Sequence, residues 1–208
     1  MPLASRAAPE PAPCGKDCPA AETLARIETL ARPLPAATGY TEVRFVQMLD
    51  GPLVLRGDLT YSSANELGKR VASPYEERTT ITNGQVEIVR PGKPVRRFSL
   101  KRAPALAGFL ESFSATLAGD AQRLARSYVL SSEGTDAQWQ LRLEPRDAAL
   151  AKHVKRVVID GRGRAPHCFE IEETGGDSSI LLVDALADTP LPAAPQRETL
   201  QQLCRHTP

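Results

Sequence analysis

The sequence has few aromatic residues, no long apolar run and almost no net charge. Phe, Trp and Tyr make up 5% of the 208 residues, so aliphatic side chains must supply most of the buried surface. No stretch of 18 consecutive apolar residues occurs, which argues against a membrane-spanning helix. Lys and Arg total 26, and Asp and Glu total 25. This balance gives no reason to expect a nucleic-acid partner or an acidic substrate.

The sequence also lacks the motifs of common enzyme classes. It contains no G-x-S-x-G motif, no P-loop and no dinucleotide fingerprint, and the GRGR run at 161–164 is not followed by a helix. The three histidines are His153, His167 and His206. Adjacent strand residues point to opposite faces, so His167 cannot act as a base for Cys168. We therefore expect no catalytic residue, no metal site and no cofactor.

Both ends of the chain are rich in proline. Residues 1–20 include five prolines within the first 19 positions and lack the apolar segment of a signal peptide, which predicts an extended arm. Residues 188–208, which include Pro190, Pro192 and Pro195, predict a similar tail. The chain is thus expected to divide into an arm at 1–20, a single domain at 21–187 and a tail at 188–208.

The four cysteines form an even set. Cys14, Cys18 and Cys204 lie in the expected arm and tail, where free thiols would be exposed, so disulfides in an oxidising compartment are the simpler account. Three pairings are possible, and the favoured one joins Cys14 to Cys18 and Cys168 to Cys204. An oxidising compartment fits a chain whose signal peptide was removed. Four free thiols in a cytosolic protein are the alternative.

Two segments show helical periodicity, and most of the remainder alternates with a period of two. Residues 21–31 carry a short apolar stripe, and residues 102–120 carry a longer one. The alternating segments predict about nine or ten strands, nearly all in hairpin order. Their turns fall at Asp50-Gly51, Asn83-Gly84 and Asp160-Gly161, among others.

An antiparallel sheet of this width curls, and its apolar concave face must be covered. The expected fold is α+β, with a large curved antiparallel sheet covered by the two amphipathic helices. The helices either fill the space as a core or form a lid over an apolar cavity, and the pattern leaves both open. If a cavity exists, the candidate ligand-binding residues are Val43, Phe45, Leu53, Leu55, Leu59 and Tyr61 on the first hairpin, Leu106, Phe109, Leu110, Phe113 and Leu117 on the lid, and Trp139 and Leu141 as the floor.

Several motifs keep the order and spacing of a known family. They are Gly57-Asp58-Leu59, Pro74, Asn83-Gly84, the strand from Trp139 to Pro145, Ile159 to Gly161, Phe169 to Ile171, and Gly176 to Leu182. On these motifs, residues 22–184 resemble the LolA family of periplasmic carriers of outer-membrane lipoproteins, and more closely its divergent relatives. The resemblance implies a half-open barrel closed by helices, an apolar cavity for acyl chains and a periplasmic location.

The chain departs from this family where LolA itself has a cavity arginine that holds lipid. Counting from Gly57, that position is Ser63, while Lys69 and Arg70 come later. Residues 67–70 also replace an aromatic run. The lipoprotein-release mechanism is therefore not carried over. The expected cargo is a lipid or a lipoprotein, and the alternative to a lipoprotein is another acyl lipid, a polyene-like lipid or another envelope lipid.

The expected function is that of a non-enzymatic, monomeric lipid carrier that exchanges cargo with a donor or acceptor protein of the envelope membranes. One alternative is an interaction module with a filled core, which cavity volume would distinguish. Another is an accessory enzyme of lipid assembly. That enzyme would need Ser63 or Tyr128 within hydrogen-bond reach of a histidine inside the pocket.

Overall fold

The computed structural model describes residues 19–63 and 65–206. The expected Cys14–Cys18 disulfide and nearly all of the expected arm lie outside these residues. Within them, eleven strands form one antiparallel sheet in the order β6-β5-β4-β3-β2-β1-β11-β10-β9-β8-β7. The strands are β1 (Ala36–Phe45), β2 (Leu53–Ser63), β3 (Glu66–Ser73), β4 (Glu77–Thr82), β5 (Gln85–Val89), β6 (Arg96–Ser99), β7 (Tyr128–Thr135), β8 (Gln138–Pro145), β9 (Val154–Arg162), β10 (Ala165–Glu173) and β11 (Ser178–Val183).

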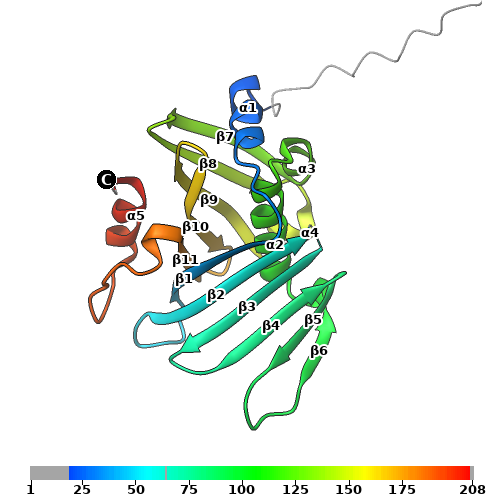
Figure 1. The fold of residues 1–208 in the computed structure, drawn as a ribbon, viewed down its shortest axis with the longest axis vertical. Helices are drawn as coiled ribbons and strands as arrows, with labels where there is room; N and C mark the ends of the chain where they lie inside the picture. Colours follow the sequence, from blue (N-terminus) through cyan, green and yellow to red (C-terminus); the bar gives the residue numbers. More distant parts are fainter. Residues whose placement is uncertain (1–18, 64, 207–208) are drawn as a thin grey trace, which may run out of the picture.

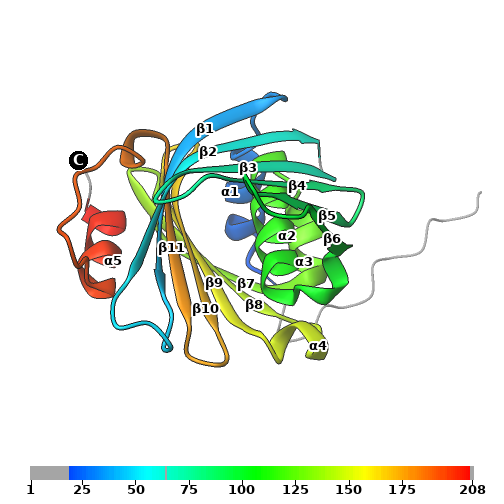
Figure 2. The same cartoon turned by 90° about the horizontal axis from the view of Figure 1, so that it is seen from below.

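The helices lie on both faces of this curved sheet. Figure 2 shows α1 (Ala21–Thr29), α2 (Pro104–Ala118) and α3 (Ala121–Ser127) inside the curve, with α5 (Arg197–His206) on the outer face. The short α4 (Ala148–Ala151) precedes β9, and single 3-10 turns occur at Leu100–Arg102 (η1) and Asp184–Leu186 (η2). The expected α+β fold with a large curved antiparallel sheet is confirmed (Figure 1).

The sheet consists of two meanders joined through β1 and β11. Strands β1 to β6 follow one another as hairpins, and so do β7 to β11. The strand count exceeds the prediction because β3 and β7 were not recognised. In β3, Lys69 separates the apolar Leu67 and Val71, so the strand has no continuous apolar face. The residues at the start of β7 read as an extension of the helical segment before it.

A glycine lets β2 and β3 pair closely. A Cβ atom at Gly57 would lie 1.7 Å from the carbonyl oxygen of Arg70, where the β2–β3 register shifts between Arg56 and Gly57. No larger residue fits without moving the backbone. The glycine of the Gly57-Asp58-Leu59 motif is therefore explained by this close approach.

Each face of the sheet carries its own apolar cluster. The larger cluster fills the concave side beneath α1, α2 and α3. The smaller one lies under α5 and includes Val43 and Cys168, with Phe45 packed against it. The prediction that Val43 and Phe45 face the lid is wrong. The register pairs Glu42 with Leu55 and Arg44 with Leu53, so the charged residues of β1 share the concave face and the apolar ones face outward.

Helix α5 lies within the segment that composition suggested was a tail. Leu200 and Cys204 are buried, and Cys204 forms a disulfide with Cys168 of β10, so this part of the favoured pairing is confirmed. Arg197 binds Glu170 at 2.6 Å and Glu172 at 3.3 Å. The helix is thus attached to the outer face by a covalent bond, apolar contacts and ion pairs.

Removing this disulfide should destabilise the protein without abolishing its fold. The bond closes a loop between positions 36 residues apart, for which the loss of chain entropy in the unfolded state corresponds to about 4 kcal/mol. We expect the double variant Cys168→Ala/Cys204→Ala to lose about that much unfolding free energy in a urea titration. Trypsin should also cleave at Arg197 faster than in the wild type. An unchanged titration midpoint would show that the disulfide contributes nothing to stability.

Candidate functional site

A cavity of about 260 Å³ lies between the concave face of the sheet and the first half of α2. Its roof is formed by Leu106 and Phe109 of α2. Its apolar walls come from both meanders, namely Leu59, Leu67, Ile81 and Ile88 on β2 to β5, and Phe169, Ile171 and Leu181 on β10 and β11. A well-packed interior has few voids larger than one water, which needs about 10–15 Å³. The interior beneath α2 is therefore not completely filled.

Aromatic stacking closes the space next to this cavity. Phe113, one helical turn after Phe109, has its ring centroid 5.3 Å from that of Phe109 and 5.0 Å from that of Phe169. Tyr61 meets Phe113 edge to face at 6.3 Å. Phe113 is buried, and only a void of about 20 Å³ remains beside it. The second half of α2 therefore packs as an ordinary core, and the cavity lies under the first half.

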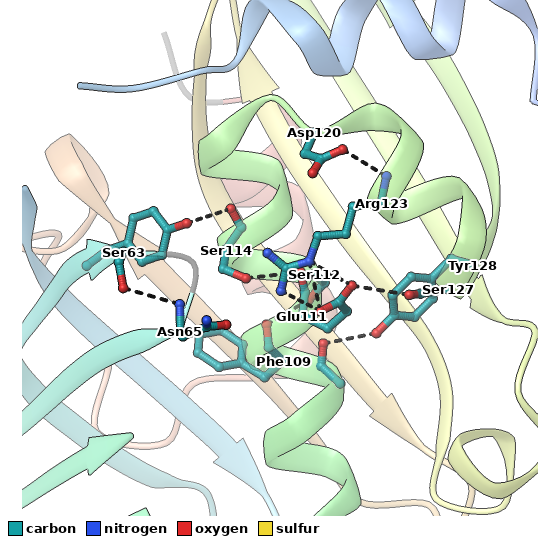
Figure 3. A network of polar contacts seen from close by, with 12 residues as sticks. Ser63, Asn65, Phe109, Glu111, Ser112, Ser114, Asp120, Arg123, Ser127 and Tyr128 are labelled. Carbon is teal, nitrogen blue, oxygen red and sulfur yellow. Dashed lines mark hydrogen bonds and ion pairs between the residues drawn. The ribbon is translucent and has the colours of Figure 1, made fainter. Parts of the chain in front are cut away.

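Polar contacts hold α2 in place from Gly108 onward (Figure 3). The hydroxyl of Tyr128 donates to the carbonyl oxygen of Gly108 at 3.0 Å, and that of Tyr61 donates to the carbonyl oxygen of Ser114 at 3.1 Å. Arg123 of α3 binds both carboxylate oxygens of Glu111, with Nη2 to Oε2 at 2.6 Å and Nε to Oε1 at 3.1 Å. This pair raises the pKa of Arg123 above its ordinary value and ties α3 to α2.

Charged side chains surround part of the cavity. Glu42 and Lys69 form an ion pair in its wall, and Arg44 Nε lies 3.9 Å from Glu42 Oε1. Glu77 and Glu173 also line it, and Glu77 Oε2 binds Arg90 Nε at 2.5 Å. The site therefore combines an apolar interior with a polar margin, as small-molecule sites commonly do.

A buried tyrosine lies beside this margin. The ring centroid of Tyr40 is 5.0 Å from Lys69 Nζ. Burial, together with the nearby Glu42 carboxylate, raises the pKa of Tyr40 well above its usual value, so its hydroxyl stays protonated at neutral pH. Its oxygen has no hydrogen-bond partner among the described residues. Tyr40 thus keeps an unused donor close to the Glu42–Lys69 pair.

The structure brings together only part of the predicted site. Leu59, Leu106 and Phe109 line the cavity, and Tyr61, Phe113 and Leu117 line the small void beside it. Leu53, Leu55, Leu110, Trp139 and Leu141 belong to the same concave cluster but line neither space. Trp139, expected on the floor, donates its indole N–H to the carbonyl oxygen of Gly163 at 2.9 Å, and Arg26 of α1 lies over its ring.

Most of the walls were not predicted. Strands β3, β4, β5, β10 and β11 contribute Leu67, Ile81, Ile88, Phe169, Ile171 and Leu181. The alternation of Phe169, Ile171 and Glu173 along β10 was a usable signal, since every second residue there faces the cavity. No sequence signal placed β10 opposite β3 and β4, because that arrangement depends on the β1–β11 pairing.

The enzyme alternative depended on the hydroxyls of Ser63 and Tyr128, and both have hydrogen-bond partners other than a histidine. Tyr128 is buried and bonded to Gly108, and Ser63 accepts a hydrogen bond from the backbone N–H of Asn65 at 3.3 Å (Figure 3). His167 Nε2 is bonded to the carbonyl oxygen of Cys204 at 2.8 Å on the outer face. In residues 19–63 and 65–206, neither hydroxyl is hydrogen-bonded to a histidine. The condition set for the enzyme alternative is not met there.

Comparison with known families identifies the chain. Residues 18–207 match the family described as outer membrane lipoprotein carrier protein LolA-like. The chain belongs to this LolA-like family. The resemblance noted in the sequence is thereby confirmed. No curated protein matches the sequence. None of the helices in the described part of this LolA-like chain has the length and apolar character needed to cross a bilayer.

Several solved structures match the chain at low sequence identity and with low TM-scores. LolA superfamily protein NE2245 from Nitrosomonas europaea is 12% identical, with a TM-score of 0.42 over 82% of this chain and 94% of that one. An outer membrane lipoprotein-sorting protein domain from Vibrio parahaemolyticus is 10% identical, with a TM-score of 0.42 over 89% and 97%. LprF from Mycobacterium bovis is 11% identical, with a TM-score of 0.35 over 86% and 98%.

The structure shows where Ser63, the residue at the place of the LolA cavity arginine, lies relative to the cavity. Ser63, at the place of the LolA cavity arginine, ends β2 and does not line the cavity, whereas Lys69 on β3 does. Arg70, the next residue, points to the opposite face and pairs with Asp58. The cavity of this LolA-like protein thus has a cation in its wall, held by Glu42.

The contribution of the Glu111–Arg123 ion pair to stability can be compared with that of the exposed Glu87–Arg97 pair. Side-chain exposure is 22% and 27% for Arg123 and Glu111, but 70% and 40% for Arg97 and Glu87. Glu111→Gln leaves a partly buried guanidinium without its carboxylate and should cost about 1–2 kcal/mol of unfolding free energy. Glu87→Gln should change it by less than about 0.5 kcal/mol. Equal losses in urea titrations would contradict a special role for the α2–α3 pair.

Proposed function

We propose that the protein is a non-enzymatic lipid carrier of the periplasm that holds an acyl chain in the cavity beneath α2. The observation that carries the proposal is the cavity of about 260 Å³ with apolar walls and a charged margin. Membership of the LolA-like family and a disulfide suited to an oxidising compartment support it. A filled interaction module fits less well, because such a core would leave no space of this size.

The cavity dimensions favour a slender cargo. Its volume is just below the range of about 300–1,000 Å³ typical of small-molecule sites. Burying each methylene of an alkyl chain contributes about 0.8 kcal/mol, and this gain does not depend on the identity of the head group. One acyl chain, or a comparably narrow apolar group, therefore suits the space better than the several chains of a lipoprotein.

The margin would hold the polar end of such a cargo. Lys69 is paired with Glu42, and the protonated hydroxyl of Tyr40 lies nearby. An anionic head group could take Lys69, which lines the cavity, as its counter-ion in exchange for Glu42. Passive binding and release need no catalytic group. Cargo enters when the first half of α2 moves away from the sheet.

Native mass spectrometry of the protein purified from a bacterial periplasm is the direct test. We expect a stoichiometric mass increase whose extract contains a fatty-acyl or polyene lipid. That result would also identify the class of cargo. A bare protein mass, together with no binding of a fluorescent fatty acid, would refute the carrier function.

A cavity-filling variant tests where the ligand binds. Leu106→Trp adds a large ring to the roof and should weaken binding of a fluorescent fatty acid by at least about tenfold, which corresponds to 1.4 kcal/mol. Leu53→Trp is the matched control, because Leu53 is a partly buried member of the same cluster that does not line the cavity. It should bind the probe like the wild type. Equal loss in both variants would place the ligand elsewhere.

A further inference from the structure

The near-neutral chain concentrates positive charge in one segment. Residues 90–102, RPGKPVRRFSLKR, contain six basic residues and no acidic one. Because the whole chain has a formal charge of +1, the remaining residues carry a net charge of −5. The segment includes β6, an end strand of the sheet, and the η1 turn that leads into α2. Figure 1 shows it at the end of the molecule distant from α5. The basic residues of this segment are called the β6 basic patch.

Most of the charge of the β6 basic patch is not neutralised by the protein. Arg90 and Arg97 are paired with Glu77 and Glu87. In the described part of the chain, the other four, Lys93, Arg96, Lys101 and Arg102, make no ion pair, and all four are exposed. Exposed like charges held this close together repel one another, so a negatively charged partner is favoured.

The patch also presents apolar groups and a cleft. Val95 is 44% exposed and Val89 is 37% exposed. A surface cleft of about 570 Å³ is lined by Val95, Arg96, Arg97, Phe98, Arg102 and Ala103. Guanidinium groups match the oxygens of a phosphate, and scattered apolar side chains suit the boundary between head groups and acyl chains. A purely acidic polypeptide would make no contact with these apolar groups. The combination therefore fits a phospholipid surface better.

The patch adjoins the cavity. Arg96 pairs with Ile88 in the β5–β6 register, so both side chains lie on the same face of the sheet. Ile88 lines the cavity beneath α2, and η1 connects β6 directly to the helix that forms the cavity roof. Figure 2 shows β5 and β6 beside α2 on the open side of the sheet. A membrane bound at the patch would therefore lie next to the cavity.

We propose that the β6 basic patch docks the protein on an anionic phospholipid bilayer. The binding is electrostatic and superficial, with Val95, which lines the cleft beside Arg96, contacting the head-group region. It concerns a surface outside the cavity and does not require the proposed carrier function. If both hold, docking places the cavity where an acyl chain can pass between membrane and protein without crossing water.

Vesicle co-sedimentation tests this docking. The wild-type protein should bind vesicles made of equal parts phosphatidylglycerol and phosphatidylcholine, should not bind pure phosphatidylcholine, and should dissociate as salt is raised. Each cation close to an anionic surface accounts for about fivefold in affinity. The triple variant Lys93→Gln/Arg96→Gln/Lys101→Gln should therefore bind about 100-fold more weakly. The exchange variant Lys93→Arg/Arg96→Lys/Lys101→Arg should retain most of the affinity.

A charge-matched control separates the patch from overall charge. Lys152→Gln/Arg164→Gln/Arg205→Gln removes three exposed cations from the end of α4, the β9–β10 turn and α5, and should leave vesicle binding unchanged. Equal weakening in both triple variants, or no binding of the wild type to anionic vesicles, would overturn the proposal. Binding of the wild type to soluble polyglutamate in place of vesicles would also overturn it.

Probe binding distinguishes this proposal from the carrier function. All substituted residues are exposed, and a thermal melt close to that of the wild type would show that each variant is folded. The patch variant should bind a fluorescent fatty acid as tightly as the wild type does. Loss of vesicle binding with intact probe binding supports docking by the patch. A wild type that binds vesicles but no fatty acid would refute the carrier function and leave the docking proposal standing.

Discussion

The pairing of β1 with β11 is the contact on which the rest of the structure depends. Six residue pairs, from Tyr40–Val183 to Phe45–Ser178, join the meander of β1 to β6 to that of β7 to β11. Within the described residues no other strand pair connects the two. The paired segments lie far apart in the sequence, but loop-closure entropy rises only slowly with loop length. Because of this pairing, one cavity receives walls from both meanders.

The sequence predicted the antiparallel strands well and the use of their faces less well. Turn dipeptides and period-two alternation identify hairpins, because both are local properties. Alternation does not show which face of the sheet packs against the helical lid. Val43 and Phe45 were therefore assigned to the wrong face of the sheet. Helix α5 was missed because prolines dominate its segment, although Leu200, Leu203 and Cys204 have helical spacing. Of the predicted site residues, only Leu59, Leu106 and Phe109 line the cavity.

The two meanders differ in what they contribute. The disulfide, α5 and the ion pairs of Arg197 strengthen β10 and the outer face. The charged margin around Lys69 and the β6 basic patch belong to the other meander, whose end strand β6 has only four residues. A whole-chain charge of +1 conceals this asymmetry, since composition averages over the surface. The charge of the surface that a binding partner would contact is therefore given by the local charge density and not by the net charge.

The positions of the side-chain hydrogen bonds to α2 determine which part of the helix can open rapidly. In the described part of the chain, side-chain hydrogen bonds to α2 begin at Gly108, while the turn from Pro104 to Ala107 is held by backbone and apolar contacts. Uncovering Leu106 then amounts to fraying one helical turn, a local event on a timescale of about a microsecond or less. Global unfolding requires the whole sheet to open and is far slower. The rate at which the helical turn over the cavity opens is thereby separated from the rate at which the protein unfolds.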